Sequence, residues 1–297
     1  MPSTLASTPA RDGLVLATRQ WPADPSAGPP WAAVLLVHGL GEHSGRYEHV
    51  GDELARAGLD VHAYDHRGFG ASAGRRAWVR NWNDVYSDLG SRLEAVRAAS
   101  SGVPLVLYGH SLGALIALGY VLRGGRDGPL PNLLVLSAPG LEDNVARWKH
   151  SLARVLDRIV PGVRIANGIG REQLAARPQE GFGYGEDPLV ENRSTVHFGA
   201  EAFAAQAAVR DAAGGLASMP IPTLVLHGGE DSIVPPSATE GLEGLRGVTR
   251  RLYPGFRHEI HNEADSPVIA DMVAWLRGQI DVLGKSSNDA PDGATIG

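Results

Sequence analysis

The fold is predicted from residues 104–122, which read Pro-Leu-Val-Leu-Tyr-Gly-His-Ser-Leu-Gly-Ala-Leu-Ile-Ala-Leu-Gly-Tyr-Val-Leu. The run from Pro104 to Tyr108 is apolar throughout, as in a buried central strand. The run from Leu112 to Leu122 has apolar residues at helical spacing. Gly109 to Gly113, between the two runs, fits the pattern G-x-S-x-G. A tight turn from a buried strand into a helix presents its serine at the end of a sheet, so we predict that Ser111 is a nucleophile.

The pattern G-x-S-x-G is weak evidence by itself, because the chain holds 38 glycines and about 0.3 matches are expected by chance. A second match occurs at Gly70 to Gly74. Its serine, Ser72, follows the polar residues 65–67 and leads into two arginines. Only Ser111 has a buried strand before it and a helix after it, so we interpret Ser72 as a loop residue.

Apolar runs and helix-like stretches alternate along most of the chain, which predicts an α/β fold with a largely parallel sheet covered on both faces. The other predicted strands are the buried runs 32–37, 59–64, 132–137 and 222–227, a final strand at 249–253 and an antiparallel edge strand at 13–21. The other predicted helices are residues 81–99 and 266–283.

Residues 138–219 break this alternation and are predicted to form a helical cap, inserted between two parts of one domain, residues 1–137 and 220–284. Residues 285–297 are polar and lack periodicity, so we predict a disordered tail. One face of a cap helix carries Val145, Trp148, Leu152, Val155, Leu156 and Ile159, before Pro161 and Gly162 end the helix. Packing of this face on the main domain is the preferred interpretation, and a lipid-facing lid is the alternative.

A serine hydroxyl needs a base that accepts its proton and a carboxylate that orients the base. In enzymes whose nucleophilic serine lies on this kind of turn, the acid and then the histidine follow later in the chain. Each lies on a loop after a late strand. Asp231 lies in the loop after the buried strand 222–227 and is the predicted acid, with Glu230 as its rival. His258 follows the last predicted strand and is the predicted base, with His261 as its rival.

Two backbone N–H groups are candidates for an oxyanion hole, which stabilises the negative charge that develops during acyl transfer. The N–H of Leu112 lies directly after the nucleophile, at the start of a helix. The N–H of Leu40 belongs to the loop 38–41, His-Gly-Leu-Gly, which follows a buried strand. Both donors are backbone groups, so the side chains at these positions matter little for this function.

Composition argues against several other functions. The net charge of −6 comes from 27 basic and 33 acidic residues that are not clustered, so we expect no nucleic-acid partner. The chain has no cysteine, and His258 and His261 do not complete the motif H-E-x-x-H, so we predict neither a metal nor a cofactor. Residues 1–11 lack the apolar core of a signal peptide, which predicts a cytoplasmic location.

Longer segments resemble the monoacylglycerol lipase and lysophospholipase-like branch of the α/β-hydrolases. Residues 38–47, His-Gly-Leu-Gly-Glu-His-Ser-Gly-Arg-Tyr, match the oxyanion-loop signature of that branch, and residues 65–74 are similar to its next loop. Residues 109–113 are similar to its elbow, and the surroundings of Asp231 and His258 to its acid and histidine loops. The resemblance implies an α/β-hydrolase fold with a mostly parallel, eight-stranded sheet, the same triad and oxyanion donors, and a mobile cap over an apolar acyl tunnel.

Together these features predict a serine carboxylic-ester hydrolase that releases a fatty acid and glycerol from a monoacylglycerol through an acyl-enzyme. Lysophospholipase and general carboxylesterase activities are the first alternatives. An acyltransferase, an amidase or peptidase, and a non-catalytic ligand receptor would keep the same pocket. The expected partner is a small lipid ester, with transient membrane contact through the cap, and the expected assembly is a monomer or homodimer.

Overall fold

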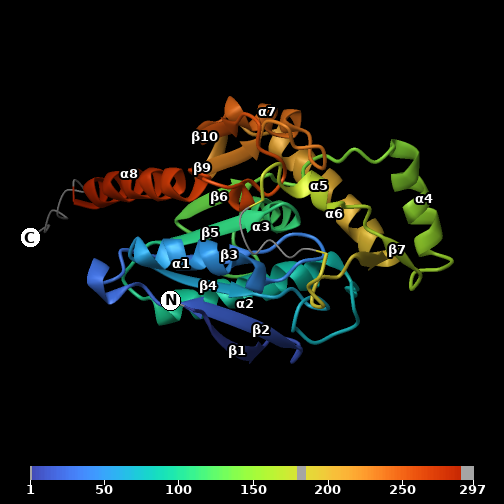
Figure 1. Cartoon of the computed structure of the whole chain (residues 1–297), viewed down its shortest axis with the longest axis horizontal. Helices are drawn as coiled ribbons and strands as arrows, with labels where there is room; N and C mark the ends of the chain where they lie inside the picture. The colour runs from blue at the N-terminus through green and yellow to red at the C-terminus, as the bar shows by residue number, and fades with distance from the viewer. Residues whose placement is uncertain (1, 179–184, 289–297) are drawn as a thin grey trace, which may run out of the picture.

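The computed structural model describes residues 2–178 and 185–288. Its centre is one sheet with the strand order β1-β2-β4-β3-β5-β6-β9-β10 (Figure 1). These strands are β1 (Thr4–Pro9), β2 (Val15–Trp21), β3 (Ala32–Val37), β4 (Leu59–Tyr64), β5 (Leu105–His110), β6 (Leu133–Ser137), β9 (Ser218–Gly228) and β10 (Arg246–Tyr253). Neighbouring strands from β4 to β10 are parallel, whereas β2 is antiparallel to β1 and to β4. The predicted mostly parallel, eight-stranded sheet is confirmed.

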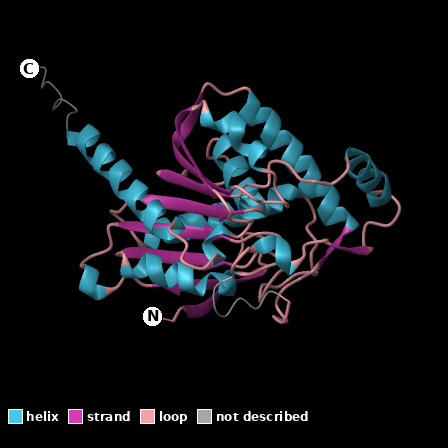
Figure 2. Ribbon diagram, turned by 45° about the horizontal axis from the view of Figure 1, so that its top comes forward, coloured by secondary structure: helices cyan, strands magenta, loops and turns pink. Residues whose placement is uncertain are grey.

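Helices cover both faces of this sheet (Figure 2). Successive side chains of a strand point to opposite faces, so Ala33, Leu35 and Val37 belong to one buried cluster and the residues between them to another. The first cluster includes side chains from α2, α3 and α6, and the second includes side chains from α1 and α8. These helices are α1 (Glu48–Arg56), α2 (Trp82–Ala99), α3 (Leu112–Leu122), α6 (Val196–Gly214) and α8 (Val268–Asn288).

The structure confirms the predicted buried elements, and β3, β4 and α3 have the predicted bounds. Strand β1 was not predicted, because its residues are mostly exposed and show no apolar alternation. It is an edge strand that pairs only with β2 in the described sheet. Helix α8 continues past Leu283 to Asn288, into the segment expected to be disordered. Residues 289–297 of that segment lie outside the described residues.

The segment predicted as a cap holds, in its described part, α4 (Arg147–Asp157), β7 (Arg164–Ala166), α5 (Arg171–Leu174), β8 (Arg193–Thr195) and α6. Strands β7 and β8 form a small antiparallel sheet. Helix α4 lies apart from the main sheet (Figure 1) and contacts α6, where His150 stacks on Phe203 with ring centroids 4.0 Å apart. Helix α6 in turn packs on α3. The division into a cap and a main domain stays a prediction.

The apolar side chains of α4 and of the residues beside it are largely exposed. Trp148 is 63% exposed and Ile159 is 69% exposed, and Leu152 and Val155 are also exposed. The preferred interpretation, that this face packs on the main domain, is therefore wrong. Periodicity identifies one face of a helix but not the partner of that face. None of the described helices combines the length and the apolar character that crossing a bilayer requires.

Candidate active site

Ser111 lies on a strained turn between β5 and α3. Its φ of 54° and ψ of −116° fall in a region that residues other than glycine rarely adopt. The surrounding backbone holds it there, since the Ser111 N–H donates to the carbonyl oxygen of Ser137 at 2.8 Å. The turn also needs space, because a Cβ on Gly113 would lie 2.1 Å from the carbonyl oxygen of Val37. The glycine pattern around Ser111 therefore has a steric cause.

We predict that Gly113→Ala destabilises the protein by about 3 kcal/mol, because the new methyl group meets backbone that cannot move aside locally. Gly241→Ala is the matched control. Gly241 lies in the short helix α7 (Glu240–Glu243) with open space around its Cα, so alanine there is expected to stabilise by about 0.5–1 kcal/mol. Urea unfolding measures both changes. Equal stability of the two variants would refute the steric account.

The structure brings Ser111, His258 and Asp231 together from three loops at the carboxyl ends of β5, β10 and β9. The Oγ of Ser111 lies 2.8 Å from Nε2 of His258, and Nδ1 of His258 lies 2.7 Å from Oδ2 of Asp231. Both His258 and Asp231 are buried. In the neutral tautomer that fits this geometry, the serine hydroxyl donates to Nε2 and the Nδ1 proton is donated to the carboxylate. This arrangement is suited to removing a proton from Ser111.

Asp231 is fixed by several donors besides the histidine. Its Oδ1 accepts from the backbone N–H groups of Ile233 and Val234 at 2.9 and 3.0 Å. Nε2 of His227 lies 3.2 Å from its Oδ2. Burial alone would raise the pKa of Asp231, but His258 and these hydrogen bonds outweigh it and lower that pKa. Asp231 is therefore a carboxylate near neutral pH.

The pKa of His258 is raised above its ordinary value. Burial acts in the opposite direction, because it disfavours the charged ring. The negative charge of Asp231 and its hydrogen bond to the ring outweigh burial. The same interactions would stabilise the imidazolium that forms when His258 takes a proton.

The two rival residues do not occupy these positions. Glu230 is exposed, although its backbone N–H donates to the carbonyl oxygen of Phe256 at 2.9 Å. His261 is buried and stacks on Tyr47 with ring centroids 5.0 Å apart. Neither ring nitrogen of His261 has a hydrogen-bond partner among the described residues.

The two predicted oxyanion donors belong to segments that lie beside the serine. Leu112 is the first residue of α3 and directly follows Ser111. The loop that carries Leu40 passes beside the serine, because a Cβ on Gly39 would lie 3.2 Å from the Cβ of Ser111. His38 fixes this loop, since its Nδ1 lies 2.8 Å from the carbonyl oxygen of Gly39. The use of these two N–H groups as donors stays a prediction.

Buried charged residues link the loop that carries Leu40 to the loop that carries His258. This link was not predicted from the sequence. Arg46 donates from Nε to Glu42 at 3.1 Å and from Nη2 to both carboxylate oxygens of Glu259 at 2.9 and 2.8 Å. Glu42 also accepts the N–H of Gly39 at 2.6 Å and the hydroxyl of Tyr47 at 2.6 Å. Burial opposes ionisation of Glu42, but the Arg46 charge, His38 and the hydrogen bond from Tyr47 together outweigh it and lower the pKa of Glu42. The network thus connects the neighbour of His258 to the neighbour of Leu40.

We predict that Arg46→Met lowers the free energy of unfolding by about 3–5 kcal/mol, because it leaves two carboxylates buried without their cation. Arg56→Met is the matched control. The side chain of Arg56 is 63% exposed beside Asp52, and its loss is expected to change stability by less than about 1 kcal/mol. Urea unfolding at pH 7 compares the two variants. Similar losses in both would mean that the buried network does not connect the loops as described.

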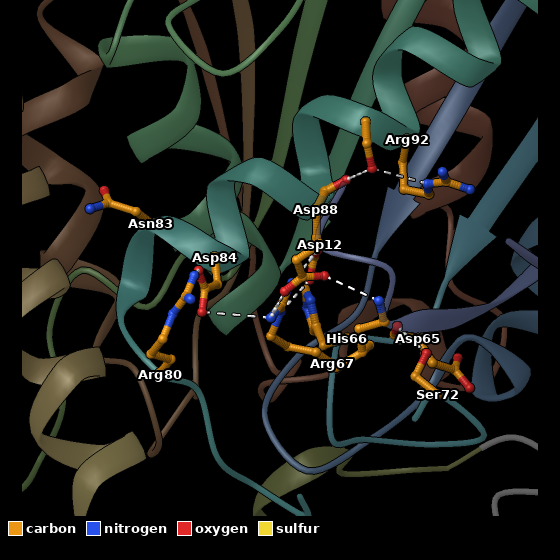
Figure 3. A network of polar contacts seen from close by, with 12 residues as sticks. Asp12, Asp65, His66, Arg67, Ser72, Arg80, Asn83, Asp84, Asp88 and Arg92 are labelled. Carbon is orange, nitrogen blue, oxygen red and sulfur yellow. Dashed lines mark hydrogen bonds and ion pairs between the residues drawn. The ribbon is translucent and has the colours of Figure 1, made fainter. Parts of the chain in front are cut away.

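Ser72 belongs to a different polar network, which holds the loop after β4 (Figure 3). Its hydroxyl donates to the carbonyl oxygen of Asp65 at 2.6 Å and accepts the N–H of Ala17 at 2.9 Å. In the same network Arg67 donates to both carboxylate oxygens of Asp88, at 2.6 and 2.7 Å. These contacts confirm the interpretation of Ser72 as a loop residue.

The strand order, the strained strand-to-helix turn and the histidine and aspartate on later loops are those of an α/β-hydrolase. Residues 28–265 match the family described as serine aminopeptidase, S33. The chain belongs to this family.

Several known proteins are similar to the chain over most of its length. A monoacylglycerol lipase from Mycolicibacterium smegmatis is 30% identical over 261 residues, which cover 83% of this chain and 88% of that protein. The crystal structure of a Paleococcus ferrophilus monoacylglycerol lipase superimposes with a TM-score of 0.75 at 30% identity and covers 88% of this chain and 98% of that one. A soluble variant of the Saccharomyces cerevisiae monoglyceride lipase has a TM-score of 0.83, 24% identity and coverage of 93% and 95%, and it supports the fold alone.

Proposed function

We propose that the protein is a serine carboxylic-ester hydrolase in which Ser111 is the nucleophile, His258 the general base and acid, and Asp231 the residue that orients the histidine. The observation that carries this proposal is the continuous hydrogen-bonded chain from the Ser111 hydroxyl through His258 to Asp231, at 2.8 and 2.7 Å. Removal of a proton from Ser111 explains three features together. These are the buried carboxylate, the raised pKa of the histidine and the strained turn at the serine.

In the first half of the reaction His258 Nε2 accepts the hydroxyl proton while Ser111 Oγ bonds to the ester carbonyl carbon. The N–H groups of Leu40 and Leu112 stabilise the resulting oxyanion. In such sites each donor lowers the activation free energy by about 3 kcal/mol. The carbon–oxygen bond to the alcohol then breaks, and the imidazolium of His258 gives its proton to the leaving oxygen. An acyl group remains on Ser111.

In the second half His258 accepts a proton from water, whose oxygen attacks the acyl carbon. The bond to Ser111 Oγ breaks, the proton returns to Oγ, and the carboxylic acid leaves. Water is the one co-reactant besides the ester in these two half-reactions. We propose that the ester is a monoacylglycerol, which yields a fatty acid and glycerol. Similarity to monoacylglycerol lipases over more than four-fifths of the chain supports this choice.

Hydrolysis of a substrate panel tests the proposed activity. The panel contains monoacylglycerols of several chain lengths, lysophospholipids, p-nitrophenyl esters and an aminoacyl p-nitroanilide, the last because the family description names an aminopeptidase. The largest kcat/KM is expected for a monoacylglycerol. A larger value for a lysophospholipid or for the anilide would reject the proposed substrate, and acyl transfer to added alcohol in excess of hydrolysis would indicate an acyltransferase.

We also propose transient membrane contact through the cap. The exposed apolar side chains of α4 and the residues around it are Val145, Trp148, Leu152, Val155, Ile159, Val163 and Ile165. A helix with one exposed apolar face and a polar opposite face can lie in the boundary between lipid headgroups and acyl chains. A monoacylglycerol would reach the enzyme from this boundary between headgroups and acyl chains. The expected monomer or homodimer and the cytoplasmic location stay predictions.

We predict that the double substitution Trp148→Ser and Ile159→Ser lowers binding to phosphatidylcholine vesicles at least tenfold. Burying one large apolar side chain is worth about 1.5–3 kcal/mol, and about 1.4 kcal/mol corresponds to tenfold in affinity. Leu5→Ser is the control, since Leu5 is 64% exposed on the edge strand β1, outside the cap. Vesicle flotation measures binding. Equal vesicle binding by the wild type, the cap variant and the Leu5 variant would contradict contact through α4.

A further inference from the structure

A cavity of about 240 Å³ lies on the α2 side of the sheet, at the edge formed by β1, β2 and β4. Thr8 and Thr18 line it from the sheet, and Arg92 and Val96 line it from α2. None of its lining residues belongs to the catalytic site described above, and none is an aspartate or glutamate. The α2 wall of the cavity thus combines the Arg92 cation with apolar groups, and the sheet wall is of mixed polarity.

Arg92 is buried, with 7% of its surface exposed, and has no ion pair in the described part of the chain. Its one hydrogen bond among the described residues is a long contact of 3.4 Å from Nε to the hydroxyl of Ser91. The nearby carboxylate of Asp88 is already bonded through both oxygens by Arg67. Figure 3 shows the Arg92 guanidinium turned away from that pair. Burial lowers the pKa of Arg92, as expected for a cation that lacks a counterion.

The other charged groups at the cavity already have partners. Nε2 of His62 lies 3.0 Å from the carboxylate of Asp60, and Arg19 forms an ion pair with Glu48. The unmatched charged group that lines the cavity is thus the Arg92 cation, which favours an anion.

The α2 wall of the cavity narrows the choice of anion. Ala95, Val96 and Ala99 form an apolar strip along the helix beside Arg92. A guanidinium donates two parallel N–H bonds to a carboxylate, whose remaining side is free for an aliphatic chain. A tetrahedral phosphate would instead turn charged oxygens toward the strip. At about 30 Å³ for each water in the liquid, the volume accommodates roughly eight non-hydrogen atoms.

We infer that this cavity binds a short-chain aliphatic carboxylate, with the carboxylate on the Arg92 guanidinium and the chain along Ala95, Val96 and Ala99. The site is separate from the proposed ester hydrolysis, and binding to it can be measured whether or not the protein hydrolyses esters. Hexanoate, with eight non-hydrogen atoms, is the matching probe.

Calorimetric titration of the whole chain with hexanoate, hexanol and inorganic phosphate tests the inference. Three variants are compared with the wild type. Arg92→Met removes the cation, Ala95→Glu places a like charge in the cavity at an exposed helix position, and Ala98→Glu adds the same charge at an exposed position that does not line the cavity. The glutamate variants keep the test valid if Arg92→Met folds poorly.

Saturable hexanoate binding that weakens at least tenfold in Arg92→Met and Ala95→Glu, and less than twofold in Ala98→Glu, is the expected result. Hexanol is expected not to bind there. Unchanged hexanoate affinity in Ala95→Glu would overturn the inference. So would phosphate binding tighter than hexanoate binding, because it would identify the site as one for inorganic anions.

Discussion

Ser111→Ala is expected to reduce ester hydrolysis by about 10⁴-fold or more while leaving the fold intact. The substitution removes the atom that forms the acyl-enzyme, and loss of a nucleophile from such a triad has effects of this size. Among the described side chains, the Ser111 hydroxyl has one hydrogen-bond partner, His258. Its removal therefore disturbs little of the surrounding structure. Steady-state hydrolysis of a monoacylglycerol, with circular dichroism as a check of folding, measures the effect.

Ser72→Ala is the matched control, because Ser72 is the serine of the other G-x-S-x-G match. Its hydroxyl bonds to backbone groups of Asp65 and Ala17, so its loss is expected to lower stability by about 1 kcal/mol and to change kcat/KM less than tenfold. Ser111→Ala with near wild-type turnover would exclude the proposed mechanism. A larger loss of kcat/KM in Ser72→Ala than in Ser111→Ala would mean that the nucleophile is Ser72 and not Ser111.

Asp231→Asn is expected to lower kcat/KM by about 10⁴-fold, because an amide cannot hold His258 in the required tautomer or stabilise its charged form. It should also change the pH dependence. His258 must be neutral to accept the serine proton, so activity rises with pH through its pKa. Because Asp231 raises that pKa, the acidic limb in the wild type is expected to have its midpoint above the ordinary histidine value of about 6.5.

Asp231→Asn is also expected to shift the midpoint of the acidic limb. Without the negative charge the imidazolium is less stable and burial dominates, so the midpoint is expected to move to lower pH in Asp231→Asn. Glu230→Gln is the control, since Glu230 is exposed and should affect neither rate nor midpoint appreciably. The pH profile of kcat/KM for p-nitrophenyl esters resolves both variants. An unmoved midpoint in Asp231→Asn would mean that another group titrates.

Sequence order and apolar runs predicted the position of the candidate triad because each member follows a buried strand. Parallel strands bring their carboxyl ends to one edge of the sheet, so Ser111, Asp231 and His258 meet there although the first and last are 147 positions apart. The same reasoning separates Ser111 from Ser72. The local sequence context was therefore sufficient to predict the three residues of the candidate triad.

Other features depend on pairings that no local pattern contains. Arg46 binds Glu259, 213 positions away, and either residue alone reads as an ordinary surface charge. Strand β1 is too exposed to show an apolar alternation. The apolar face of α4 was visible in the sequence, but its exposure to solvent was not, because periodicity does not identify what covers a face.

Active-site labelling with a fluorophosphonate, followed by peptide mass mapping, tests whether Ser111 carries the acyl group during monoacylglycerol hydrolysis. We expect one modified residue, Ser111, with loss of hydrolysis in proportion to labelling and protection by monoacylglycerol. Modification of another serine in proportion to lost activity, or full hydrolysis by protein that is completely labelled at Ser111, would show that Ser111 is not the nucleophile.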